Sequence, residues 1–314
     1  MTNKKVQINI VYSPATGPQK IMFENERGVI WQGPQYDSGK NNVGMGWYSI
    51  RNPKPSDSIL VVEPFCVLQR DYDVSFLKRF KHIFTWATKA MNHEAIKNKV
   101  VAINHPTYHN IPNLSNISKN WMPWDKREDE IVIIANNKAS QHHSELYSLR
   151  VYLADLLDVY SPFKVSWYGQ IPLKKKYFRG TLPNKAEVLG KAKFSICTEN
   201  SFDQIYTHNY FTEKMPDVWM HGAVPIYMGC YNINDLGSLN GCYIDLRPLI
   251  EKSGKSWKVN KEALNNKIVT YTEQQYQDYI KNLNDHVVKT KLLEKHHAYS
   301  NVYEKMIDTF YERR

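Results

Sequence analysis

Three consecutive side chains offer the chemistry of phosphate and sugar binding. Thr212, Glu213 and Lys214 place a hydroxyl, a carboxylate and an ammonium at the start of a predicted helix. The free N–H groups and the positive dipole end of a helix attract phosphate there, and Lys214 adds a full charge. The Glu213 carboxylate can accept hydrogen bonds from sugar hydroxyls. Together these residue types predict a site for a nucleotide diphosphate that carries a sugar.

The flanking sequence predicts the elements that would position these side chains. An apolar run at residues 193–198 predicts a strand, and a polar loop separates this strand from a helix that begins at Thr212. Gly222 is a residue type that typically ends a helix, and a second apolar strand is predicted at residues 224–228. The segment is therefore expected to run strand, loop, helix, strand, with its chemistry at the helix start.

The rest of the chain also alternates strands and helices. The clearest helix is predicted at residues 144–160, where leucines recur on one face, and a shorter one at residues 184–192. Residues 272–311 predict two or three more helices. The other strand-like runs are residues 6–12, 58–62, 82–86, 99–103, 130–135 and 163–167. Strands that alternate with helices predict an α/β fold built on parallel sheets.

A stretch rich in Pro, Asn and Ser predicts a domain boundary. Residues 104–127 lack sustained periodicity, and a length of 314 residues accommodates two domains. We predict an N-terminal α/β domain at residues 1–125 and a C-terminal α/β domain at residues 126–295. Two such domains resemble the GT-B plan, which implies that the first is the acceptor-binding domain and the second the nucleotide-sugar-binding domain. Residues 296–314 predict a C-terminal helix that crosses back to the first domain. Two Rossmann-like domains facing a cleft are the expected architecture.

The chain is basic, and its charge limits the choice of partners. There are 41 Lys and Arg against 31 Asp and Glu, a formal net charge of +10, which attracts phosphorylated donors, nucleic acids or acidic membranes. No nucleic-acid-binding motif accompanies this charge, so no nucleic-acid partner is expected. The densest basic cluster, residues 174–176, is interpreted as a solvated loop. The alternative is a glycan-, lipid- or phosphate-facing patch, which leaves peripheral membrane contact open.

Motifs of the second half occur in a distinctive order. They are Glu199-Asn200, then Tyr210-Phe211-Thr212-Glu213-Lys214, and then the run GAVPIYMG at residues 222–229. Upstream, the run EIVIIANNK is followed by Arg150 on a predicted helix. This order resembles the α-1,3-fucosyltransferases of glycosyltransferase family 10, over about residues 130–229. The resemblance implies a GT-B-like fold and a sugar-nucleotide donor.

The resemblance also implies roles for individual residues. The implied donor contacts are Arg150, Asn200, Tyr210, Glu213 and Lys214. Arg150 and Lys214 resemble the pair that neutralises the donor diphosphate. Charge considerations agree, because the diphosphate gains negative charge when the glycosidic bond breaks, and two fixed cations stabilise it without a metal. Tyr206 is the alternative to Tyr210, because the spacer before Tyr210 is long. A surface position is the alternative for Arg150, and a solvated helix start is the alternative for Glu213 and Lys214.

The catalytic base is implied to lie in the first half. Inversion needs a carboxylate that takes the proton of the acceptor hydroxyl. The family places a Glu after a strand of the first domain, and the matching position here is Glu63. It follows the predicted strand at residues 58–62, where open α/β sheets place ligand groups. A surface-loop Glu beside Pro64 is the alternative interpretation.

The implied activity is inverting transfer of L-fucose from GDP-fucose to a hydroxyl of a glycan acceptor. The expected linkage is α-1,3 to N-acetylglucosamine or glucose. A GT-B transferase that uses another GDP-sugar is one alternative. A non-catalytic glycan- or nucleic-acid-binding protein is the other. No cofactor and no metal are expected, although Asp71-Tyr72-Asp73 has the D-x-D form that can hold a divalent cation.

Cysteine usage and hydropathy suggest a compartment. Cys66, Cys197, Cys230 and Cys242 show no metal-ligand spacing and indicate a reducing environment, with a Cys230–Cys242 bridge left open. No run of eighteen apolar residues and no signal peptide are apparent. We therefore expect a cytoplasmic enzyme, bacterial or viral, without a transmembrane segment. A Golgi lumenal catalytic domain is the alternative.

Overall fold

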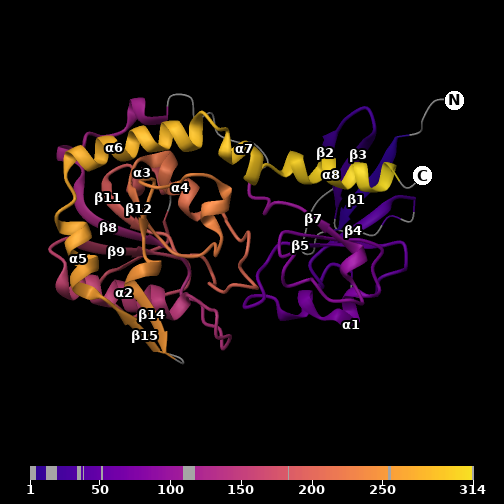
Figure 1. The fold of residues 1–314 in the computed structure, drawn as a ribbon, viewed down its shortest axis with the longest axis horizontal. Helices are drawn as coiled ribbons and strands as arrows, with labels where there is room; N and C mark the ends of the chain where they lie inside the picture. The colour runs from indigo at the N-terminus through magenta and orange to yellow at the C-terminus, as the bar shows by residue number, and fades with distance from the viewer. Residues whose placement is uncertain are drawn as a thin grey trace. The chain divides into compact units, whose positions relative to one another are not determined.

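The computed structural model describes residues 5–11, 20–33, 37, 39–50, 52–108, 117–182, 184–253 and 256–312. The chain forms two compact units (Figure 1). Unit 1 comprises Met1–Ile111, Asp203–Tyr210 and Lys295–Arg314, and unit 2 comprises Pro112–Phe202 and Phe211–Glu294. The first boundary thus differs from the expected residue 125. Unit 1 also includes the short segment 203–210, which lies within the second domain expected from the sequence.

Unit 1 is built on a seven-stranded sheet with the order β2-β3-β1-β4-β5-β6-β7. Its pairings are parallel except for the antiparallel edge pair β2–β3. The strands are β1 (Val6–Val11), β2 (Lys20–Glu24), β3 (Gly28–Gly33), β4 (Asn41–Met45), β5 (Ser58–Val61), β6 (Ile83–Thr85) and β7 (Val100–Ala102). A mostly parallel sheet must be covered on both faces, and both faces of this sheet are covered.

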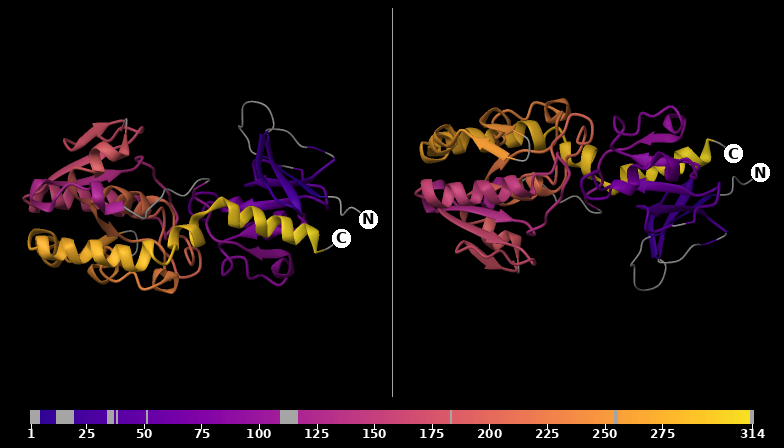
Figure 2. Two further views of the ribbon diagram at one scale, coloured as in Figure 1. Left: turned by 90° about the horizontal axis from the view of Figure 1, so that it is seen from above. Right: turned by 90° about the horizontal axis from the view of Figure 1, so that it is seen from below.

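Alternate residues of β5 serve the two faces of this sheet. Leu60 packs into a core with helix α8 (Tyr299–Tyr311), whereas Ile59 and Val61 pack into a second core with α1 (Val74–Leu77). Figures 1 and 2 show α8, in yellow, lying along the strands of unit 1. The C-terminal helix is thus part of the hydrophobic core of the N-terminal half.

Unit 2 contains a six-stranded parallel sheet with the order β10-β9-β8-β11-β12-β13. The strands are β8 (Glu128–Ile134), β9 (Lys164–Tyr168), β10 (Phe178–Gly180), β11 (Ala192–Ile196), β12 (Val224–Tyr227) and β13 (Ile244–Asp245). This is the strand order of a doubly wound nucleotide-binding fold. Successive strands are added to one side of β8 as far as β10, and from β11 onward they are added to its other side, so the strand order reverses between β8 and β11. A small hairpin, β14 (Ile250–Ser253) with β15 (Ser256–Val259), lies outside the sheet.

Helices cover both faces of the unit 2 sheet, with α2 on one side and α6 on the other (Figure 1). They are α2 (Tyr147–Tyr160), α3 (Lys185–Leu189), α4 (Lys214–His221), α5 (Lys261–Val269) and α6 (Glu273–Leu283); α7 (Leu292–His297) continues the chain toward α8. A capping box of Thr272 and Gln275 starts α6. The hydroxyls of Tyr276 and Tyr279 donate to the carbonyl oxygens of Gly222 and Ala223, which fixes the link between α4 and β12.

Two global features bear on the sequence expectations. All four cysteines are free and buried, so Cys230 and Cys242 form no bridge. Within the described ranges, no helix combines the length and the apolar character needed to cross a membrane.

Candidate functional site

A pocket of unit 2 opens beside the carboxyl ends of β8 and β11, where the strand order reverses. Such a switch point is where open α/β sheets bind ligands. The pocket has a volume of about 260 Å³, whereas a single water needs only about 10–15 Å³. It is lined by Ile134, Ala135, Asn136, Lys138, Tyr147, Arg150, Lys185, Leu189, Ser195, Ile196, Cys197, Thr198, Asn200, Glu213, Lys214, Asp217 and Val218.

Helix α4 presents its first turn to this pocket. It begins at Lys214 with Glu213 as the N-cap residue, and it ends at Gly222, whose φ of 82° is the left-handed conformation that suits glycine. Thr212, where the sequence predicts the helix to begin, lies two residues before the observed start of α4. Its N–H and its hydroxyl donate to the Glu199 carboxylate, at 2.9 and 2.7 Å.

Lys214 lies between two carboxylates. Its Nζ donates to Glu199 Oε2 at 2.9 Å and lies 3.9 Å from Glu213 Oε1. Burial lowers the pKa of the ammonium, but the charges of Glu199 and Glu213 outweigh this effect and raise the pKa of Lys214 above its ordinary value. Lys214 therefore faces the pocket as a full cation.

Arg150 projects from α2 and fastens the backbone that follows β11. Its guanidinium donates to Thr198 Oγ1 at 3.0 Å, to the Thr198 carbonyl at 2.9 Å and to the Glu199 carbonyl at 3.0 Å. Only 3% of Arg150 is exposed, so the surface position considered from the sequence is wrong. Its positive charge is held at the pocket wall in a fixed orientation.

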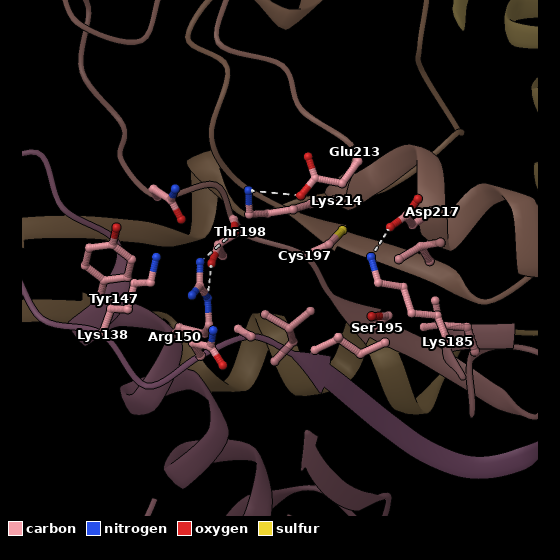
Figure 3. A pocket seen from close by; sticks show the side chains of 17 residues that line it. Lys138, Tyr147, Arg150, Lys185, Ser195, Cys197, Thr198, Glu213, Lys214 and Asp217 are labelled. Carbon is pink, nitrogen blue, oxygen red and sulfur yellow. Dashed lines mark hydrogen bonds and ion pairs between the residues drawn. The ribbon is translucent and has the colours of Figure 1, made fainter. Parts of the chain in front are cut away.

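A second ion pair lies at the other side of the pocket. Lys185 Nζ and Asp217 Oδ2 are 2.5 Å apart, and Figure 3 shows this pair opposite Lys138, Tyr147 and Arg150. The cationic lining residues Lys138, Arg150, Lys185 and Lys214 outnumber the lining carboxylates Glu213 and Asp217. The pocket therefore favours an anionic ligand.

Four of the predicted donor-contact residues are brought together here. Arg150, Asn200, Glu213 and Lys214 all line the pocket, although they come from α2, from the loop after β11 and from the start of α4. The fold therefore places all four around one pocket. Their individual contacts with a donor stay predictions.

Glu63 belongs to unit 1 and follows β5 at its carboxyl end. It is half-buried, and its carbonyl accepts a hydrogen bond from the Tyr72 hydroxyl at 3.0 Å. The carboxyl end of a parallel sheet is a suitable place for a catalytic base. The role of Glu63 as that base stays a prediction.

The D-x-D motif nearby is divided between two structural roles. Asp71 is completely buried, and its Oδ1 accepts a hydrogen bond from Trp47 N at 2.7 Å. Burial, opposed by this bond and reinforced by Glu63, raises the pKa of Asp71 to about 7. Asp73 instead caps α1 through Ser75. Among the described residues, no group of three or more His, Cys, Asp or Glu could hold a metal ion.

Tyr210 also belongs to unit 1, where its ring is buried. It stacks on Trp86 with centroids 4.8 Å apart, and it meets the edge of His105. Its alternative, Tyr206, packs against Phe65 in the same unit. The ring of Tyr210 is therefore a core side chain, and its contact with a donor stays a prediction.

Several polar residues of the pocket were not predicted. Lys138, Lys185 and Asp217 line it, and Glu199 supports Lys214 from below. A signal existed for Asp217, which follows Lys214 by three residues and so shares its helix face. In the basic cluster of residues 174–176, Lys175 and Lys176 form ion pairs with Asp155 and Asp158.

Comparison with known proteins gives the fold. No family model and no curated protein matches the chain. Among solved structures, an α1,3-fucosyltransferase is similar at 15% identity with a TM-score of 0.52, covering 89% of this chain and 80% of that one. An α-glucosyltransferase in complex with UDP and DNA is similar at 10% identity with a TM-score of 0.53, covering 85% and 79%. Its complex with UDP-glucose and DNA has a TM-score of 0.50 at 11% identity, covering 86% and 79%. The chain thus has the α/β fold of GT-B glycosyltransferases.

Proposed function

We propose that this protein is a glycosyltransferase that binds a sugar nucleotide in the unit 2 pocket, with GDP-fucose as the donor. The observation that carries the proposal is the gathering of Arg150, Asn200, Glu213 and Lys214 around one cationic pocket at the switch point of a doubly wound sheet. The shared fold with glycosyltransferases supports it. The choice of fucose rests on the motif order of residues 199–229.

The proposed reaction is a single inverting displacement. The acceptor hydroxyl attacks the anomeric carbon of fucose, the bond from that carbon to the β-phosphate oxygen breaks, and GDP leaves. Glu63 takes the proton of the attacking hydroxyl. The negative charge that develops on the departing diphosphate is stabilised by Lys214, by the start of α4 and by Arg150 as the second cation of the pocket wall. The acceptor is proposed to be a glycan, with α-1,3 linkage to N-acetylglucosamine or glucose.

The thiol at the pocket wall takes no part in this chemistry. Burial, reinforced by Glu199, raises the pKa of Cys197 well above its ordinary value, so the thiol stays protonated. A protonated thiol is a poor nucleophile. The pocket therefore favours direct displacement over a covalent intermediate on this cysteine.

A panel of nucleotides tests the donor. We expect GDP and GDP-fucose to raise the melting temperature of the protein, and GDP-fucose with a glycan array to give a fucosylated product. UDP-sugars are the informative competitor, because two of the similar structures contain UDP or UDP-glucose. Stabilisation by UDP-sugars alone would contradict the GDP assignment. Binding of a glycan without turnover on any donor would favour a non-catalytic lectin-like role.

A further inference from the structure

The Glu199 side chain is completely buried beneath the pocket. Its carboxylate accepts hydrogen bonds from the backbone and side chain of Thr212 and from Lys214, and the Tyr227 hydroxyl lies 3.4 Å away. A charge is costly to bury unless it is paired and hydrogen-bonded. The Glu199 carboxylate is paired with Lys214 and hydrogen-bonded to Thr212, so it is the centre of a polar network next to the pocket.

The surrounding backbone leaves room for this side chain. A Cβ atom added to Gly229 would lie 2.1 Å from Glu199 Cγ, so a larger residue there would displace it. The Glu199 carbonyl also accepts a hydrogen bond from Arg150 at 3.0 Å. The two cations assigned to the diphosphate are therefore fastened to the same residue, one through its carbonyl and one through its carboxylate.

We propose that Glu199 is a positioning residue for the donor diphosphate, which fixes the Lys214 ammonium at the pocket wall and keeps it charged. This inference rests on the proposed function, because that function assigns the pocket to a nucleotide. Glu199 does not line the pocket, so its carboxylate affects a ligand there through Lys214.

The charges around Lys214 show why Glu199 is needed. Burial favours the neutral amine, and the Arg150 guanidinium opposes a second positive charge nearby. Glu213 is a weaker partner, since it lies at 3.9 Å with 41% of its side chain exposed, whereas Glu199 lies at 2.9 Å with none exposed. Without the Glu199 charge, the remaining neighbours would leave Lys214 easier to deprotonate.

The test replaces the charge and keeps the shape. In Glu199→Gln, we expect the pKa of Lys214 to fall, as measured by NMR on protein labelled with ¹³C-lysine and assigned with Lys214→Arg. The affinity for GDP should then fall relative to the wild type as the pH rises above the new Lys214 pKa, by at most about tenfold per pH unit, and should level off at the affinity of Lys214→Ala. Taking the ratio at each pH cancels the titration of GDP itself.

Two further variants separate charge from structure. Glu199→Gln combined with Lys214→Arg should lose this pH dependence, because a guanidinium is not deprotonated in this range. Asp129→Asn is the matched control: Asp129 pairs with Lys193 at 2.6 Å, at the opposite end of β8 from the pocket. It should bind GDP like the wild type at every pH.

An unchanged Lys214 pKa in Glu199→Gln, or an affinity ratio that does not vary with pH, would overturn the inference. If Glu199→Gln does not fold, the Lys214 pKa of the wild-type protein is the deciding measurement. A wild-type Lys214 pKa at or below that of exposed lysines would also overturn the inference. Failure of the wild type to bind GDP would instead overturn the proposed function, whatever the Lys214 pKa does.

Discussion

At the residue scale, the two cations of the pocket differ in how their charge is held. Arg150 is fixed by three hydrogen bonds to the loop after β11, whereas Lys214 is fixed by the Glu199 carboxylate and by the Thr212 hydroxyl. Both lie where an anion would bind, so both should contribute to affinity for a diphosphate. Arg150 also holds the loop after β11, and Lys214 also holds the start of α4. Variants of either residue therefore need a control for correct folding.

Removing either cation should weaken nucleotide binding. Lys214→Ala and Arg150→Ala should each cost about 1.5–3 kcal/mol of GDP binding free energy, the range for hydrogen bonds to charged groups. Isothermal titration calorimetry on folded variants measures this. Lys126→Ala removes an exposed cation of the same unit that does not line the pocket, and it should have no effect. Unchanged affinity in both pocket variants would show that the nucleotide binds elsewhere.

Glu63 should affect chemistry and not donor binding. Glu63→Gln should bind GDP like the wild type but transfer sugar about 10²–10⁴-fold more slowly, since general base catalysis contributes that much. Initial rates with saturating donor and acceptor measure the loss. Glu94→Gln, an exposed carboxylate of the same unit, is the control. A fully active Glu63→Gln would exclude Glu63 as the base.

Asp71 should make the stability of unit 1 depend on pH. Its pKa of about 7 in the folded state lies above the ordinary value of 3.8, so the folded state holds a proton that the unfolded state releases. The stabilisation is complete below about pH 4 and is lost as the pH rises through 7, at about 1.4 kcal/mol per unit of pKa difference.

Asp71→Asn removes this titration and keeps an acceptor for Trp47 N. Its melting temperature should therefore fall less between pH 5 and pH 8 than that of the wild type. Thermal melts at both pH values measure the difference. Parallel curves for the two proteins would mean that Asp71 is already ionised in the folded state.

At the element scale, most apolar strands were predictable, although β3 was missed, and the polar strand β4 was not predictable. All eight predicted strands are present within one or two residues of their expected ends. The missed strands of unit 1 include β4, whose Asn42 is buried and accepts a hydrogen bond from Asn9 of β1. Hydrogen bonds with Asn9 of the neighbouring strand and with the backbone of Asp37 and Lys40 satisfy this asparagine in the sheet interior, and sequence periodicity does not reveal these partners.

The pocket residues likewise divide into those that the sequence predicts and those that only the folded structure brings to the pocket. Arg150, Asn200, Glu213 and Lys214 were found because they belong to a motif within one contiguous region. Lys185 was missed because it reaches the pocket from α3 only after the sheet has formed. The role of Glu199 was missed for a similar reason, since its carboxylate meets Lys214 across a loop of fourteen residues, 200–213.

The C-cap of α4 provides a test at the element scale. Gly222 has a φ of 82°, and an added Cβ would lie 2.4 Å from Arg127 Nη2 and 2.5 Å from Trp121 Cδ2. Gly222→Ala should therefore cost more than the roughly 1 kcal/mol expected for backbone conformation alone. Gly180 is the matched control, because its φ is 86° and an added Cβ would have open space.

Chemical denaturation of both variants measures the two costs. Gly180→Ala should lose about 1 kcal/mol of unfolding free energy, and Gly222→Ala should lose clearly more. Equal losses would mean that Arg127 and Trp121 move aside freely.

At the scale of the whole molecule, the C-terminal helix completes the N-terminal half. Val302, Tyr303, Met306 and Ile307 of α8 pack into a core with β1 and β3. Met306→Ala should cost about 2–5 kcal/mol of stability, as expected for a fully buried methionine. Glu304→Ala, on the exposed side of α8, should change stability by no more than about 0.5 kcal/mol. Similar melting temperatures for these two variants would contradict this packing.

The composition of unit 1 from three separate stretches also bears on how such a protein can be recombined. A contiguous gene fragment ending at residue 111 would encode neither α8 nor the segment 203–210 with its buried Tyr210. A chimera that exchanges this half with that of another protein of the same fold therefore needs three inserted pieces and four junctions. New properties of unit 1 would accordingly arise more readily through substitutions within it than through wholesale exchange of domains.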